Sequence, residues 1–137
     1  MILIDTNIVS AIMAPSPKVT VLDWLNSQDT MTLYLSTITI AEIGFGLNIM
    51  PDGKRKKLLA ERFEGFIARG FNQRILSFDE PAAHKYAEIM GHRRAIGRPL
   101  NVPDGQIASI ARVNNFSIAT RNIRDFEECG LNLINPF

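Results

Sequence analysis

Two kinds of apolar pattern alternate along this chain. Short runs of consecutive apolar residues, bounded by polar ones, are typical of strands covered on both faces of a parallel sheet. Longer segments repeat their apolar residues with the period of an amphipathic helix. The short runs lie at residues 2–4, 32–35, 74–76, 117–119 and 132–134, and the helical segments at 19–25, 38–47, 58–67, 82–90 and 103–111.

This alternation predicts the fold class. Strands separated by helices form βαβ units, and these predict an α/β fold with a mostly parallel five-stranded sheet and helices on both faces. We find no internal repeat, low-complexity stretch or linker, so we expect one domain over residues 1–137. The hydrophobic content of 46% suits a packed globule of this size.

Three observations bear on the cellular setting. No apolar run approaches the roughly 20 residues that a membrane span needs. The apolar start has no basic segment and meets Asp5 at once, which predicts a strand and not a signal peptide. Cys129 is the only cysteine, which excludes an intramolecular disulfide, and no base stands beside it in sequence to activate it. We expect a cytoplasmic protein with an inert thiol.

Acidic residues follow the predicted strands. Asp5 ends the first strand, Glu42 follows the second strand on the next helix, and Asp125 follows the fourth strand. Asp104 lies in the first turn of the helix before that strand, directly after Pro103. Because ligands bind beyond the carboxyl ends of the strands in an open α/β sheet, the four acids are expected at one functional edge.

Two of these acids, taken singly, also fit structural roles. Asp5 fits an Asx-turn at the strand end, with Thr6 or Asn7 capping the helix that follows. Glu42 stands three residues after Thr39, which is the spacing of a capping box. Either role would explain the residue without any chemistry.

The other two acids fit helix ends. Asp104 suits a first turn, where the helix macrodipole favours negative charge, and Asp125 has a cap-like spacing to Glu128. Four carboxylates gathered at one edge, however, repel each other and are costly to bury. Taken together they favour a bound cation.

The ligand chemistry indicates Mg²⁺ or Mn²⁺. Hard carboxylate oxygens suit these ions, and the chain lacks the histidine or thiolate set of a zinc or copper site. His84 and His92 share one predicted helix away from the strand ends, where we expect surface or packing roles. No Ser–His or Cys–His pair offers a nucleophile, so metal-activated water is the natural attacking group on a phosphodiester.

The charge distribution allows a polyanionic partner. The net charge is +1, but if four of the 14 acids form one site, ten remain to face 15 basic residues elsewhere. Bases cluster at residues 54–57 and at Arg93, Arg94 and Arg98. The alternative is that residues 54–57 only solvate the first turns of a helix.

Five motifs, in order and over the whole chain, resemble those of the PIN-domain family. They are Met1-Ile2-Leu3-Ile4-Asp5-Thr6-Asn7, Ser36 to Ile43 with Gly46, Pro103-Asp104-Gly105-Gln106-Ile107-Ala108, Ala119-Thr120-Arg121-Asn122 with Asp125-Phe126, and Ile134-Asn135-Pro136-Phe137. Within the family the chain is most similar to the VapC and FitB toxin components of bacterial toxin–antitoxin pairs.

The resemblance implies an α/β/α sandwich whose acidic pocket binds Mg²⁺ or Mn²⁺ and cleaves RNA. Asp5, Glu42 and Asp104 match the first three acids of the family. Asp5 and Asp104 are then the best candidates for direct metal ligands, and Glu42 for orienting metal or water. The polar residues expected to brace the pocket or to bind substrate are Thr6, Asn7, Thr120, Arg121 and Asn122.

The fourth acid is where this sequence departs from many relatives. They carry an aspartate directly after Thr-Arg, where this chain has Asn122. Others have the Thr-Arg-Asn form with an acid three residues later, as Asp125 is here. We assign the fourth acid to Asp125 and keep Asn122, which can coordinate through its carbonyl oxygen, as the alternative.

The resemblance also implies partners. Toxins of this type are usually homodimers, and an antitoxin neutralises them with a tail that lies across the pocket. The apolar residues around Phe45, Leu47, Phe63 and Phe66 could supply such surfaces or could be ordinary core. The leading hypothesis is an endoribonuclease toxin. The alternatives are a structure-specific DNA nuclease and a non-catalytic module that binds a partner peptide in its acidic pocket.

Overall fold

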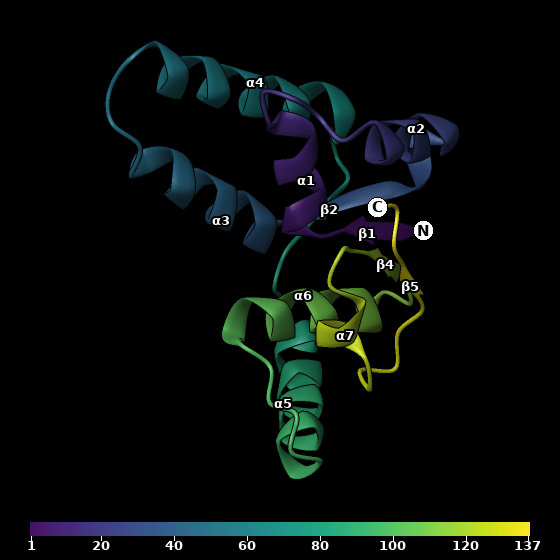
Figure 1. Ribbon diagram of the computed structural model, residues 1–137. Coiled ribbons are helices and arrows are strands. Elements are labelled where there is room, and N and C mark those ends of the chain that lie inside the picture. Colours follow the sequence, from purple (N-terminus) through teal and green to yellow (C-terminus); the bar gives the residue numbers. More distant parts are fainter.

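A five-stranded sheet forms the centre of the computed structural model, which describes residues 1–137 (Figure 1). Its strands run in the order β3-β2-β1-β4-β5, and every neighbouring pair is parallel. The predicted strands are all confirmed, as β1 Ile2–Ile4, β2 Leu33–Ser36, β3 Ile75–Leu76, β4 Ser117–Ala119 and β5 Leu133–Ile134. The sheet is entirely parallel, where the sequence predicted it to be mostly so.

Helices cover both faces of this sheet. One face carries α1, α2 and α4, and the other carries α5 and α6, which gives three layers (Figure 1). The helical elements are α1 Thr6–Met13, α2 Val19–Ser27, the 3₁₀ turn η1 Thr30–Thr32, α3 Thr37–Asn48, α4 Lys54–Gly70, α5 Glu80–Ala95, α6 Val102–Val113 and α7 Ile123–Phe126. The apolar pattern predicted five of them but not the three shortest, α1, η1 and α7. None of the helices has both the length and the apolar character that a membrane crossing demands.

Alternate residues of the strands serve two separate cores. Leu3 and Ile118 contribute to the core under α5 and α6, whereas their neighbours Ile4 and Ala119 contribute to the core under α1, α2 and α4. Side chains along a strand point to opposite faces, so a strand covered on both sides must be apolar at every position. This requirement explains the unbroken apolar runs in the sequence, and it leaves the strand ends as the first places for polar side chains.

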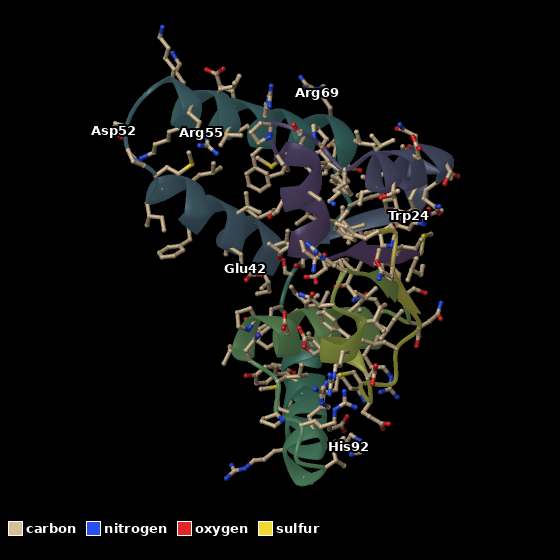
Figure 2. All side chains as sticks on the ribbon, viewed as in Figure 1. Trp24, Glu42, Asp52, Arg55, Arg69 and His92 are labelled. Atoms are coloured by element: carbon tan, nitrogen blue, oxygen red, sulfur yellow. The ribbon has the colours of Figure 1, made fainter.

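Helices α3 and α4 form an arm that extends from the sheet, with Asp52 at its tip (Figures 1 and 2). Of the apolar residues predicted around this arm, Phe63 is core and Phe66 packs on the ring of Phe71, with 5.0 Å between centroids. Phe45, in contrast, is 67% exposed, as is Ile49 at the C-terminal cap of α3. Phe63 is therefore a core residue, whereas Phe45 lies on the surface, and its part in an interface stays a prediction.

The two basic clusters differ in their environment. The run at residues 54–57 occupies the first turn of α4 and is mostly exposed, in keeping with its solvating role. Arg93, in contrast, is only 4% exposed. It therefore does not belong to a basic surface, and the expected cluster with Arg94 and Arg98 loses its first member. His84 and His92 are exposed, as expected.

Candidate active site

The site begins where strands β1 and β4 end. Asp5 directly follows β1 and Thr120 directly follows β4, and the Thr120 hydroxyl donates a 2.8 Å hydrogen bond to Asp5 Oδ2. The strand order changes direction between these two neighbouring strands. Ligands of open α/β sheets bind in the crevice that such a change creates, because the following loops and helices turn to opposite faces. Asp5 therefore lies at the position that the topology favours for a site.

Asp5 is a buried carboxylate with several hydrogen-bond donors. It is 3% exposed, and it accepts from the Thr6 backbone N–H at 2.7 Å and from Asn7 Nδ2 at 3.1 Å in addition to Thr120. Asp5 is itself the N-cap of α1, so the expectation that Thr6 or Asn7 caps this helix is wrong. The reason is that β1 ends at Ile4 and α1 begins at Thr6, so Asp5 is the only residue between them and takes the N-cap position.

Burial raises the pKa of Asp5 to about 6, against 3.8 for a solvated aspartate. The hydrogen bonds from Thr120 and Thr6 act in the opposite direction, and the negative charges of Asp104 and Glu42 add to the increase. The desolvation of the ionised form is thus the largest effect. A carboxylate held in this way is stabilised by a nearby cation.

Glu42 reaches the site from α3 through Thr6. The Thr6 hydroxyl donates a 2.8 Å hydrogen bond to Glu42 Oε1 and lies 3.0 Å from the hydroxyl of buried Thr39. The predicted capping box of Thr39 and Glu42 is wrong, because α3 begins earlier, with Ser36 as the N-cap that accepts from the Thr39 N–H. Glu42 therefore has no role at the helix end. Figure 2 shows it facing the space between the upper and lower helices.

Asp104 stands in the first turn of α6, as predicted, and Asn101 fixes it there. Asn101 Nδ2 donates to Asp104 Oδ2 at 2.9 Å, and Asn101 Oδ1 accepts from the Asp104 N–H at 2.9 Å. Burial raises the pKa of Asp104, and the charges of Asp125 and Glu42 raise it further, against the effects of Asn101 and Arg93. Asp104 thus lies close enough to Asp125 and Glu42 for their charges to act on it.

The glycine after Asp104 determines how closely α6 approaches α5. Gly105 is buried, and a Cβ at this position would lie 2.5 Å from Met90 Sδ and 3.0 Å from the Tyr86 ring. A larger residue would displace the Met90 side chain and crowd the Tyr86 ring on α5. In the sequence Pro103-Asp104-Gly105, the acid is therefore followed directly by the small residue that packs against α5.

Asp125 lies on α7 and is exposed, and its charge acts on Asp104. The cap-like pairing with Glu128 is not formed: Glu128 lies beyond α7 and its carboxylate is 3.9 Å from His92 Nε2. Asn122 is also exposed, and its backbone N–H donates to the Thr120 hydroxyl at 3.0 Å. Of the two residues proposed for the fourth position, Asp125 is the one that carries a charge, and this charge acts on Asp104.

Sequence reasoning missed three residues that hold the site together, namely Thr39, Asn101 and Arg93. The guanidinium of Arg93 donates to the backbone carbonyls of Arg98, Asp125 and Glu127 at 2.6, 2.8 and 2.9 Å. It therefore fixes the segment that carries Asp125. The Asn-x-x-Asp spacing of a capping box could have identified Asn101, but no local pattern identifies a basic residue that will be buried.

The donor set suits a hard cation. The side chains that meet here are carboxylates, hydroxyls and amides, and no histidine or thiol belongs to the set. Such oxygen donors match Mg²⁺ and Mn²⁺. The structure contains no group of three or more acids, histidines or cysteines that is spaced to hold a metal ion as it stands. Burial raises the pKa values of Asp5 and Asp104, the charges of neighbouring acids raise them further, and a bound cation would favour the ionised forms.

Two clefts border the site, one on each side of α1. The first, which we call the arm cleft, has a volume of about 500 Å³ and is lined by Thr6 and Glu42 together with Met13, Ile43, Leu47, Arg55 and Leu59. The second has a volume of about 310 Å³ and is entered beside Asn7. Both therefore open onto residues that contact the acids.

The sequence of most of the chain matches a known family model. Residues 2–130 match the model of the PIN domain. The chain belongs to the PIN-domain family. Over all 137 residues this PIN domain is 45% identical to the plasmid stability protein StbB of Pseudomonas syringae pv. tomato, covering 99% of that protein. It is 41% identical to the VapC ribonuclease Y4jK of Sinorhizobium fredii, covering 98% of it.

The fold agrees with this assignment. The crystal structure of FitAcB from Neisseria gonorrhoeae superposes with a TM-score of 0.93 at 39% identity, covering 99% of this PIN domain and 98% of the FitAcB chain. The match extends over all three layers and over every strand that ends at the site. This PIN domain is thus a nuclease-family protein related over its full length to toxin components.

Proposed function

We propose that this PIN domain is an endoribonuclease, dependent on Mg²⁺ or Mn²⁺, and the toxin component of a toxin–antitoxin pair. The observation that carries the proposal is buried Asp5, which has a pKa near 6 and lies in the field of Asp104 and Glu42 where the strand order changes direction. Its relatives named VapC ribonuclease and toxin FitB support the substrate class and the biological role.

Four acids divide the work in this proposal. Asp5 and Asp104, the two whose pKa values are raised, hold the metal ion, and Glu42 and Asp125 complete the charge around it. A divalent ion held there would lower the pKa of a bound water and offset charge on the attacked phosphate. Glu42 Oε1 accepts from Thr6, which leaves Oε2 free to orient the attacking water or to take its proton. Thr120, Asn7 and Asn101 keep the carboxylates in position.

The proposed partners follow from the same relatives and from the arm. The structure of VapBC2 from Rickettsia felis, 26% identical with a TM-score of 0.80, is bound to a DNA fragment from the promoter of the pair. We infer that an antitoxin tail occupies the arm cleft, whose apolar wall ends at Glu42. A homodimer would bury the exposed Phe45 and Ile49 of α3. With RNA as its substrate, the enzyme acts in the cytoplasm.

The decisive experiment compares wild type, Asp5→Asn and Asp23→Asn in a bacterium and with purified protein. Asp23 is an exposed aspartate on α2 and serves as the matched control. Wild type and Asp23→Asn are expected to arrest growth and to cleave RNA with Mg²⁺ or Mn²⁺, whereas Asp5→Asn does neither. RNA cleavage that persists in Asp5→Asn or in excess chelator contradicts the metal–carboxylate mechanism. Cleavage of flap or single-stranded DNA in preference to RNA contradicts the proposal that RNA is the substrate.

A further inference from the structure

The cleft on the Asn7 side of α1 differs in character from the arm cleft. We call it the Arg121 cleft, and its lining residues are Asn7, Ala11, Ser16, Lys18, Arg121 and Phe137, with Ser10 and Ala14 at the border shared with the arm cleft. Its volume of about 310 Å³ is at the lower end of the range for small-ligand sites, roughly 300–1,000 Å³. No acidic side chain lines it.

Asn7 connects this cleft directly to the acids. Its Nδ2 donates to Asp5 Oδ2 at 3.1 Å and lies 3.3 Å from the Thr120 hydroxyl, while its Oδ1 accepts from the Arg121 backbone N–H at 3.1 Å. One side chain therefore separates the buried carboxylate from the cleft. A ligand that enters the acidic site from this side must pass over the Arg121 cleft.

Two positive charges in the cleft have no counterion. Lys18 and Arg121 are exposed, and neither makes an ion pair, as is the case for most bases of this chain. What distinguishes the two is that they share a cleft that no acidic side chain lines. The guanidinium of Arg121 lies 5.4 Å from the centroid of the Phe137 ring, which holds it as a flat surface at the wall of the cleft. Two cations without a neighbouring acid, in a cleft next to the acidic site, suit an anionic ligand that extends from this cleft into the acidic site.

We propose that the Arg121 cleft binds the nucleotide that flanks the scissile phosphodiester of a single-stranded RNA substrate. Lys18 and Arg121 contact its phosphates, and the Arg121 guanidinium, backed by Phe137, stacks on its base. This inference rests on the proposed function and deepens it. An acidic peptide is a weaker match, because it would use the two cations but not the flat guanidinium face, and it would meet four carboxylates next to the cleft.

The experiment measures RNA binding in the Asp5→Asn background, in which cleavage is expected to be absent. The affinity of a short, fluorescently labelled single-stranded RNA is determined by anisotropy at several salt concentrations. Each lost phosphate contact lowers the slope of log affinity against log salt by about 0.7, which corresponds to about fivefold in affinity at 0.1 M salt. We expect this change for Lys18→Gln. Arg121→Gln should change the slope by the same amount but lower the affinity further, because it also removes the surface on which the base stacks. Arg94→Gln, which removes an exposed charge on α5, is the matched control and should change neither quantity.

A second variant tests the stacking surface. Phe137→Leu keeps apolar volume but removes the ring that holds the Arg121 guanidinium, so the RNA should bind between about 2- and 5-fold more weakly with an unchanged salt slope. Circular dichroism and thermal unfolding confirm that the variant is folded. In the cleaving enzyme, Arg121→Gln should raise KM and leave kcat within the same order of magnitude.

The outcomes separate this inference from the proposed function. RNA cleavage by wild type, combined with affinities and slopes of Lys18→Gln and Arg121→Gln that match those of Arg94→Gln, overturns the Arg121 cleft alone. Absence of both cleavage and RNA binding in the parent proteins overturns both proposals. Tight binding of an oligoglutamate peptide that is lost in Arg121→Gln, with no effect of this variant on RNA, identifies an acidic protein partner and overturns the RNA assignment.

Discussion

The hydroxyl of Thr6 donates a 2.8 Å hydrogen bond to Oε1 of Glu42, and this bond joins α1 to α3. Thr6 also follows Asp5 directly in the sequence, so the position of Glu42 is tied to that of Asp5. The Thr39 hydroxyl, 3.0 Å from that of Thr6, lies near the Ser36 hydroxyl in turn, at 3.4 Å. The orientation of Glu42 thus depends on a series of three hydroxyls that begins at Ser36, the N-cap of α3. The acid–base role that we propose for Glu42 requires this orientation.

Replacing Thr6 tests that dependence. Thr6→Val keeps the side-chain volume but removes the donor, so Glu42 is no longer oriented, and we expect kcat for RNA cleavage to fall about 10- to 100-fold. Thr6→Ser retains the hydroxyl and should keep most of the rate. Steady-state kinetics of the two variants and wild type make the comparison. Equal rates in Thr6→Val and Thr6→Ser would show that this bond has no part in catalysis.

The raised pKa of Asp5 predicts a pH-dependent stability without metal. Between about pH 4 and pH 6 native Asp5 binds more protons than unfolded Asp5, so its contribution to stability falls as the pH rises and does not recover above pH 6. Over this pH range the free energy of unfolding falls by up to about 3 kcal/mol because of Asp5. Asp5→Asn removes this loss, so its free energy of unfolding relative to wild type should be higher at about pH 7.5 than at about pH 4. Urea unfolding with a chelator present at both pH values measures it, and a pH-independent difference would refute it.

The fourth acid is tested by two single variants. Asp125→Asn removes the charge that acts on Asp104, and we expect a loss of about 10- to 100-fold in RNA cleavage or in the affinity for Mn²⁺. Asn122→Ala leaves the backbone N–H that donates to Thr120, so the rate should stay close to that of wild type. Cleavage rates across a Mn²⁺ titration distinguish the two variants. The opposite order of effects would assign the fourth position to Asn122.

Arg93 should matter for stability and not for the binding of polyanions. Arg93→Met leaves three backbone carbonyls without their donor, and we expect a loss of about 2–4 kcal/mol in the free energy of unfolding. The variant should also cleave RNA more slowly, because the segment that carries Asp125 loses its support. Arg94→Met, at the neighbouring exposed position, is the control and should be near wild type in urea unfolding. A surface role for Arg93 predicts equal stabilities for the two variants.

Several features of the fold and the site could be predicted because they are local. The strands at 2–4 and 117–119 are apolar except for Ser117 because both faces of the sheet are covered, and Asp5 and Thr120 follow the last residues of these strands. Parallel strands end at one edge, so the order of elements alone brought the acids of the predicted site to the same side. The apolar pattern did not predict α1, because this helix has only eight residues and begins one residue after the strand.

The sequence by itself determined the parallel sheet, the two covered faces and the edge that carries the acids, since these follow from the period of the apolar residues. Only the tertiary structure decided which partners the acids have. Thr6 with Glu42 and Thr120 with Asp5 are 36 and 115 residues apart, and their contact depends on how helices and strands pack. The same holds for Arg93, which resembles a surface base in the sequence. The carbonyls that satisfy its buried charge come from segments up to 34 residues away, so no local pattern could reveal it.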